Sequence, residues 1–268
     1  MKILLAIILI SALPIIASDE IDNLYSLNKT NQLSFTSKVN NHTYHIYIKS
    51  PEKPKQGALY PVVYVIDGGI TFPLLASYSH YLTLAEDIPD VIMVGISYGT
   101  SDWQKGNKRS TDFTAPSNER EFWGGAEKFS EMLRTELFPL VEEQTPADPE
   151  KRIIFGQSLG GQFVIYTMMF QPDLFYGHIS SNPALHRNVA FFQQAPVRAK
   201  TQQNIFIARA KDDAPVFVDA ADQWLGYWND KGYPWQMKEM WFAGHNHFSI
   251  APNAYRQGML YFFPVAKK

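Results

Sequence analysis

The chain has 268 residues, no cysteine and a formal net charge of −2, and its 46% hydrophobic and 19% charged residues are typical of a globular protein. This length suits one α/β domain with a full core. The lack of cysteine excludes disulfides, a catalytic thiol and Cys-based zinc sites, and the near-neutral charge without a basic cluster argues against nucleic acid as a partner.

Residues 1–17 have the parts of a secretory signal peptide. Lys2 supplies one positive charge, residues 3–10 form an unbroken apolar run, and small residues follow at the end of the segment. We expect cleavage after Ala17 or the serine that follows it, which leaves a single domain, 18–268, in the periplasm or secreted. An uncleaved membrane anchor is the alternative, but the apolar run is short for a bilayer span. We therefore expect no stable membrane insertion after cleavage.

Strand and helix patterns alternate along the rest of the chain, which predicts an α/β fold with a mostly parallel sheet flanked by helices. The predicted strands are 33–37, 43–48, 62–66, 91–96, 152–155, 175–179, 205–210 and 236–242. The predicted helices are 70–85, 126–143, 161–170, 216–231 and 250–263. The first two strands flank an Asn-Asn turn, so we expect them to form an antiparallel edge of the sheet.

Two interruptions of this pattern are informative. Pro139 falls inside a predicted helix and should kink it or end its first part. Residues 98–117 are polar and contain Gly, Pro, Lys and Arg, so they read as a long loop. A loop of that length in a compact domain is usually functional.

A G-x-S-x-G pattern, Gly-Gln-Ser-Leu-Gly, occupies residues 156–160 between a predicted strand and a predicted helix. The flanking glycines leave room for a sharp bend that exposes the Ser158 hydroxyl at the top of the sheet. A serine hydroxyl becomes a good nucleophile when a base removes its proton. This pattern in this context predicts a serine hydrolase.

The base and the acid are expected after Ser158, in the order acid and then histidine that α/β hydrolases use. His247 follows the last predicted strand and is the favoured base, with His245 as the alternative. Asp213 follows the strand 205–210 and is favoured as the acid over Asp212. The structural alternative for either aspartate is a helix N-cap, where Asp is common.

The tetrahedral intermediate of ester cleavage needs backbone N–H donors for its oxyanion. The amide of Leu159, directly after the serine, is one expected donor. Gly69 is the other, because it follows the strand 62–66 and a glycine lets the backbone approach a substrate closely. A simple turn is the alternative reading of Asp67-Gly68-Gly69. The chemistry requires no cofactor or metal, and the sequence lacks ligand spacing such as H-E-x-x-H.

Aromatic and basic residues crowd the expected rim of this site. They are Tyr98, Trp103, Phe113, Phe122 and Trp123, with Lys105, Lys108, Arg109 and Arg120 among them. We take Arg109, Trp123 and Gln157 as candidate substrate-binding residues. An aromatic, partly anionic ester such as a catecholate lactone would suit stacking and cation–π contacts. The alternative is that the aromatic residues pack the domain and the lysines are solvated.

Seven segments together resemble the putative-esterase family of α/β hydrolases, which includes the periplasmic enterochelin (siderophore) esterases, esterase D and the antigen 85 mycolyltransferases. The segments are 63–68, 109–114, 124–129, 136–139, 156–161, 172–175 and 181–185. The resemblance covers residues 35–264. It is strongest to the siderophore-esterase branch, in which an R-x-x-D-F/Y-T-P-like segment precedes G-G-A-x-x-F.

This resemblance implies Ser158 as nucleophile, His247 as base, and the amides of Gly69 and Leu159 as the oxyanion hole. Some members of the siderophore branch work with a Ser–His pair alone, so the third acid stays open. The sequence departs from the family pattern at Gln157, where a histidine is usual, and at Ala115, which is inserted before the proline.

The expected function is therefore that of an exported serine esterase that hydrolyses small carboxylic esters, such as siderophore-type lactones, through an acyl-enzyme. An acyltransferase that passes the acyl group to a sugar or alcohol is one alternative. A non-catalytic binding protein on a hydrolase fold is another. The sequence leaves the oligomeric state open.

Overall fold

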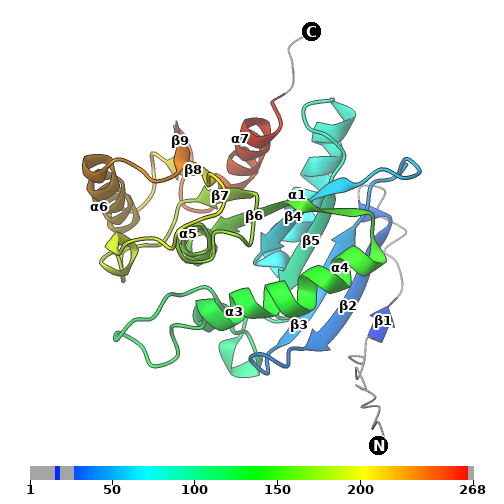
Figure 1. The fold of residues 1–268 in the computed structure, drawn as a ribbon, viewed down its shortest axis with the longest axis horizontal. Helices are drawn as coiled ribbons and strands as arrows, with labels where there is room; N and C mark the ends of the chain where they lie inside the picture. The colour runs from blue at the N-terminus through cyan, green and yellow to red at the C-terminus, as the bar shows by residue number, and fades with distance from the viewer. Residues whose placement is uncertain (1–15, 19–26, 265–268) are drawn as a thin grey trace, which may run out of the picture.

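In the residues that the structure describes, a mostly parallel sheet has nine strands in the order β1-β2-β3-β5-β4-β6-β7-β8-β9, and it runs through the molecule (Figure 1). The computed structural model describes residues 16–18 and 27–264 of the chain. The strands are β1 Ile16–Ser18, β2 Thr30–Thr36, β3 Thr43–Lys49, β4 Tyr60–Ile66, β5 Ile92–Ser97, β6 Ala147–Gln157, β7 Gly177–Ser181, β8 Asn204–Ala210 and β9 Gln236–Phe242. Pairing is antiparallel from β1 through β2 and β3 to β5, and parallel from β5 to β9. The α/β-hydrolase architecture and its antiparallel edge are thus confirmed, while most of the predicted signal peptide lies outside the described residues.

Helices cover both faces of the sheet (Figure 1). The longer ones are α1 Gly68–Leu84, α3 Ala126–Met132, α4 Phe138–Gln144, α5 Leu159–Phe170, α6 Pro215–Lys231 and α7 Ala251–Phe262. Short helical turns are η2 Trp103–Lys105, α2 Arg109–Asp112 and η4 Phe191–Gln193. Helices α1 and α7 pack on one face, and α3, α4 and α5 pack on the other. Among the described residues, no helix is long and apolar enough to span a bilayer.

Strand β4 shows why the sheet is buried on both faces. Val63 and Val65 enter the core beneath α1 and α7, whereas Tyr64 and Ile66 enter the core beneath α3 and α5. Successive side chains of a strand point to opposite faces, so a strand covered on both sides tends to have a near-continuous apolar sequence. The continuous apolar run at 62–66 therefore identifies a central strand.

Four elements differ from their predicted form. Strand β6 begins at Ala147 rather than at 152. The helix predicted at 126–143 is broken by a π-helical segment, η3 Leu133–Leu137, directly before α4, whose first turn holds Pro139. Strand β7 begins at Gly177, because Phe175 instead packs its ring against Phe138 and Tyr64 in the turn before the strand. The loop predicted at 98–117 contains the short helical turns η2 and α2.

Gly156, the first glycine of the G-x-S-x-G segment, has no room for a side chain. A Cβ built there would lie 2.3 Å from the Gly160 carbonyl oxygen and 2.9 Å from Ile66 Cδ1. We expect Gly156→Ala to destabilise the protein by roughly 1–3 kcal/mol through overpacking. Gly226, on α6 with open space around it, is the matched control, because Gly→Ala in a helix interior stabilises by about 0.5–1 kcal/mol. Thermal unfolding of both variants checks this, and equal midpoints would contradict it.

Candidate active site

Ser158 occupies a strained turn between β6 and α5, with φ 60° and ψ −118°. Its amide donates to the carbonyl of Ser181 at 3.0 Å, and its carbonyl accepts from the amides of Gln162 and Ala184 at 2.9 and 3.0 Å. A non-glycine residue persists in a rare backbone conformation only when its surroundings hold it there, and such strain is common at functional sites. The G-x-S-x-G segment therefore forms the bend expected of a nucleophile elbow.

His247 and Asp213 are brought together from loops thirty-four positions apart in the chain. His247 Nδ1 lies 3.0 Å from Asp213 Oδ1 and 2.9 Å from Asp213 Oδ2. The Asp213 side chain is only 3% exposed, and it also accepts a hydrogen bond from the Ala214 amide at 2.7 Å. A carboxylate held on Nδ1 fixes the ring so that Nε2 can act as the proton acceptor.

The His247 loop also contacts the elbow. Gln157 Nε2 donates to the main-chain carbonyl of His247, and Asn182 Nδ2 donates to the same carbonyl at 3.4 Å. Because Gln157 directly precedes Ser158, this contact brings the loop that carries the histidine to the serine. The main chain of His247 therefore lies beside the segment that carries Ser158.

The alternatives to these two residues have other surroundings. The His245 ring has other partners: its Nδ1 lies 3.2 Å from the Ser249 carbonyl oxygen in the same loop, and its Nε2 lies 2.8 Å from the side-chain Nδ2 of Asn253 in α7. Asp212 is exposed. Of the candidates, the geometry pairs only His247 with an aspartate that follows β8.

The two expected oxyanion donors lie in the first turns of two helices. Leu159 begins α5 and Gly69 is the second residue of α1, so Gly69 is helical where the sequence suggested a loop. The first amides of a helix have no acceptor within the helix and favour negative charge. The two helices begin at the carboxyl ends of β6 and β4, which are neighbours in the sheet. The first N–H groups of both helices therefore lie at the same end of the sheet.

Arg109, a candidate substrate-binding residue, contacts two protein groups. Its Nε donates to Asp67 Oδ1 at 2.5 Å, and its Nη2 donates to the carbonyl of Gln157 at 3.3 Å. Asp67 lies directly between β4 and α1. Arg109 therefore ties the segment that carries Gly69 to the segment that carries the serine.

Only part of the predicted aromatic rim is exposed. Phe113 is fully buried and Tyr98 is 7% exposed, so both pack the core. Tyr98 also donates to the buried Asp112 carboxylate at 2.9 Å, and burial raises its pKa. Trp103 is 71% exposed and Phe122 is 49% exposed. The rim prediction is thus wrong for the two residues that the core absorbs.

Trp123 is half-buried beside a second loop. The Arg187 guanidinium carbon lies 5.9 Å from the Trp123 ring centroid, and Arg187 Nη1 donates to Glu119 Oε2 at 3.1 Å. Asn188 Nδ2 donates to the Pro116 carbonyl at 2.5 Å. These contacts join the 116–123 loop to the loop that follows Ala184, which bonds the Ser158 carbonyl.

Sequence reasoning missed residues that pack around His247. The Phe217 ring stacks on the His247 ring with centroids 4.1 Å apart, and the His186 ring meets Phe217 edge-on at 4.9 Å. Burial, and then the positive charge of Arg187, lower the pKa of His186. A phenylalanine at helical spacing ordinarily indicates core, so no sequence signal distinguished Phe217 from other core residues.

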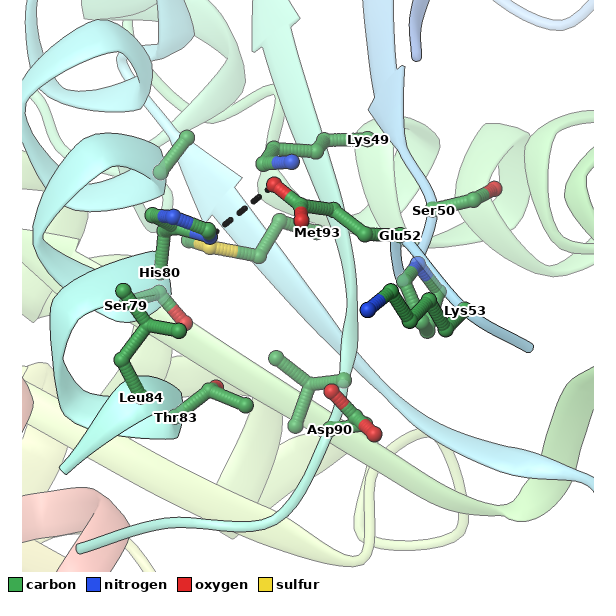
Figure 2. Close-up of a pocket in the computed structure, with 13 residues that line it drawn as sticks. Lys49, Ser50, Glu52, Lys53, Ser79, His80, Thr83, Leu84, Asp90 and Met93 are labelled. Atoms are coloured by element: carbon green, nitrogen blue, oxygen red, sulfur yellow. Dashed lines mark ion pairs between the residues drawn. The ribbon is translucent and has the colours of Figure 1, made fainter. Parts of the chain in front are cut away.

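A cavity of about 270 Å³ lies at the end of the sheet where β5 begins, and Figure 2 shows the side chains that line it. Its walls come from the end of β3, the last turns of α1 and the start of β5. His80 Nδ1 pairs with Glu52 Oε1 there at 3.3 Å. Because Ser158 follows the carboxyl end of β6, this cavity is separate from the candidate site. Among residues 16–18 and 27–264, no group of three His, Cys, Asp or Glu side chains could hold a metal ion.

The sequence matches the protein family described as "Putative esterase" over residues 37–250. It is 32% identical over 211 residues to the ferri-bacillibactin esterase BesA of Bacillus subtilis, and this alignment covers 73% of this chain and 70% of that protein. It is 27% identical over 164 residues to the apo-salmochelin esterase of Escherichia coli O6:H1, which covers 58% of this chain and 51% of that protein. The solved structure of the BES protein from Bacillus cereus superposes with a TM-score of 0.75 at 23% identity, over 89% of this chain and 97% of the other.

Proposed function

The chain belongs to the putative esterase family, and from that premise we propose that it is an exported serine esterase that hydrolyses siderophore-type lactones. The observation that carries the serine mechanism is the Asp213–His247 pair, held on a loop that contacts the strained elbow of Ser158. Membership of the family, together with relatives that are named as esterases, supports ester hydrolysis. The substrate class is supported by relatives that are named as siderophore esterases, and export by the apolar N-terminal run.

In the proposed reaction, His247 Nε2 takes the proton of the Ser158 hydroxyl as Oγ attacks the ester carbonyl. The negative charge on the carbonyl oxygen is stabilised by the amides of Leu159 and Gly69. The imidazolium then protonates the leaving alcohol, and an acyl-Ser158 ester remains. Water, deprotonated by His247, hydrolyses this ester and returns both residues to their starting state. Asp213 holds the correct tautomer and stabilises the imidazolium between these steps.

The substrate proposal is tested by presenting the purified protein with a catecholate trilactone, a simple aryl ester and an acetylated sugar. We expect the trilactone to have the highest kcat/KM, with linear hydrolysis products identified by mass spectrometry. The Trp123–Arg187 pair offers an aromatic ring and a guanidinium for an anionic aromatic ester, and Arg187 lies in the loop whose Ala184 amide binds the Ser158 carbonyl. A higher kcat/KM for the acetylated sugar would reject the lactone as the substrate class while leaving the esterase chemistry intact.

A further inference from the structure

The main-chain carbonyl of His247 receives two side-chain amide donors from different parts of the sheet. Gln157 donates from the end of β6, and Asn182 donates from the residue that follows β7. Both side chains belong to buried residues, which are 8% and 4% exposed. A carbonyl oxygen has two lone pairs, so two donors can satisfy it fully. The backbone of the proposed base is thus held from two strands at once.

The Asn182 amide has no freedom to rotate away from this role. Its Oδ1 accepts from the Ala210 amide at 2.8 Å, while its Nδ2 donates to His247. The main-chain N–H of Asn182 donates to the Ala208 carbonyl at 2.9 Å, and the backbone angle φ of Asn182 is 40°. Asparagine tolerates this left-handed backbone better than most residues do. An amide rotated by half a turn would lose both of these side-chain hydrogen bonds.

Gln157 links the histidine loop to the rest of the site. Its carbonyl accepts from Arg109, which also binds Asp67 directly before α1. Its side chain binds His247, and its main chain continues into Ser158. One residue therefore connects the nucleophile, the base and the segment that carries the expected oxyanion donor Gly69.

The Gln157 side chain points toward the His247 main chain, whereas a substrate-binding side chain would point into open space beside Ser158. The Gln157 side chain is buried, and its amide N–H is used by a protein carbonyl rather than offered to solvent. We propose that Gln157 and Asn182 are positioning residues that hold His247 in register with Ser158. The proposal rests on the proposed function, because it assumes that His247 is the base. The imidazole is fixed by Asp213 and Phe217, and the two amides fix the main chain that carries it.

Gln157→Met tests this role, since it keeps the side-chain length and removes the donor. We expect kcat for an aryl ester to fall by about 10- to 100-fold, because displacing a reacting group by about 1 Å costs this much. KM should stay within about twofold, because no substrate contact is lost. Gln223→Met, at an exposed position of α6, is the matched control and should leave both constants unchanged. Wild-type kcat in Gln157→Met, with or without a raised KM, would overturn the proposal.

Two further variants separate the hydrogen bond from mere packing. Asn182→Asp keeps the acceptor for Ala210 but turns a carboxylate oxygen toward the His247 carbonyl, so kcat should fall as in Gln157→Met. Gln157→His keeps an N–H donor and should retain more of kcat than Gln157→Met. An equal loss in both Gln157 variants, or wild-type kcat in Asn182→Asp, would overturn the hydrogen bond as the cause. Thermal unfolding of each variant checks that it folds. If Gln157→Met does not fold, kcat of Asn182→Asp and of Gln157→His tests the proposal in its place.

Ser158→Ala, measured beside them, separates this inference from the proposed function. Undiminished turnover in Ser158→Ala would remove the serine mechanism itself. Abolished turnover in Ser158→Ala together with wild-type kcat in Gln157→Met would remove only the positioning role.

Discussion

We expect Ser158→Ala to lower kcat for ester hydrolysis by about 10⁴-fold or more, because the covalent path is lost and only binding and oxyanion stabilisation remain. The loss should be in kcat, with KM changed little, since the hydroxyl contributes bond formation rather than substrate affinity. Initial rates with an aryl ester measure both constants. A fluorophosphonate should add one mass increment to the wild-type protein, on the peptide that contains Ser158, and none to the variant.

The matched control for this variant is Ser34→Ala. Ser34 lies half-buried on β2, in the antiparallel part of the sheet, far along the strand order from β6. Its loss should leave both kcat and labelling unchanged. Residual turnover of Ser158→Ala within about tenfold of wild type would mean that the ester is cleaved by another group.

The sheet was predictable because its central strands are buried on both faces. Val63 and Val65 belong to the continuous apolar run 62–66, whereas a helix that covers one face of the sheet needs apolar residues on one side only. The exceptions arose where tertiary packing competed with local pattern. Phe175 reads as a strand residue, yet its ring fills the space beside Tyr64 and Phe138. Tyr98 and Phe113 read as loop residues, yet the core takes both.

Of the candidate site, sequence order predicted which residues would follow the strand ends, and could not predict which way their side chains point. Asp213 and His247 follow β8 and β9, and parallel strands deliver such residues to one edge of a sheet. Arg109 and Gln157 also reach this edge, but both turn toward protein atoms. Direction depends on partners that are distant in the chain, and no single segment of sequence contains that information.

We expect Asp213→Asn to lower kcat by on the order of 10³-fold, because an asparagine N–H facing His247 Nδ1 selects the wrong tautomer. In that tautomer the proton sits on Nε2, so the ring cannot accept the Ser158 proton. The side chain is nearly isosteric, so the folded structure should persist, and circular dichroism with thermal unfolding checks this. Steady-state kinetics with an aryl ester measures the loss.

Asp212→Asn is the matched control, because it makes the same chemical change at the adjacent, exposed position. We expect its kcat to stay within about twofold of wild type. The pair of variants also decides the question that the family resemblance leaves open. If both retain wild-type kcat, then the enzyme works with Ser158 and His247 alone, and the buried Asp213 carboxylate only shapes the loop. A loss confined to Asp213→Asn, with an unchanged unfolding midpoint, would make the carboxylate part of the catalytic apparatus, because Asp213 contacts His247.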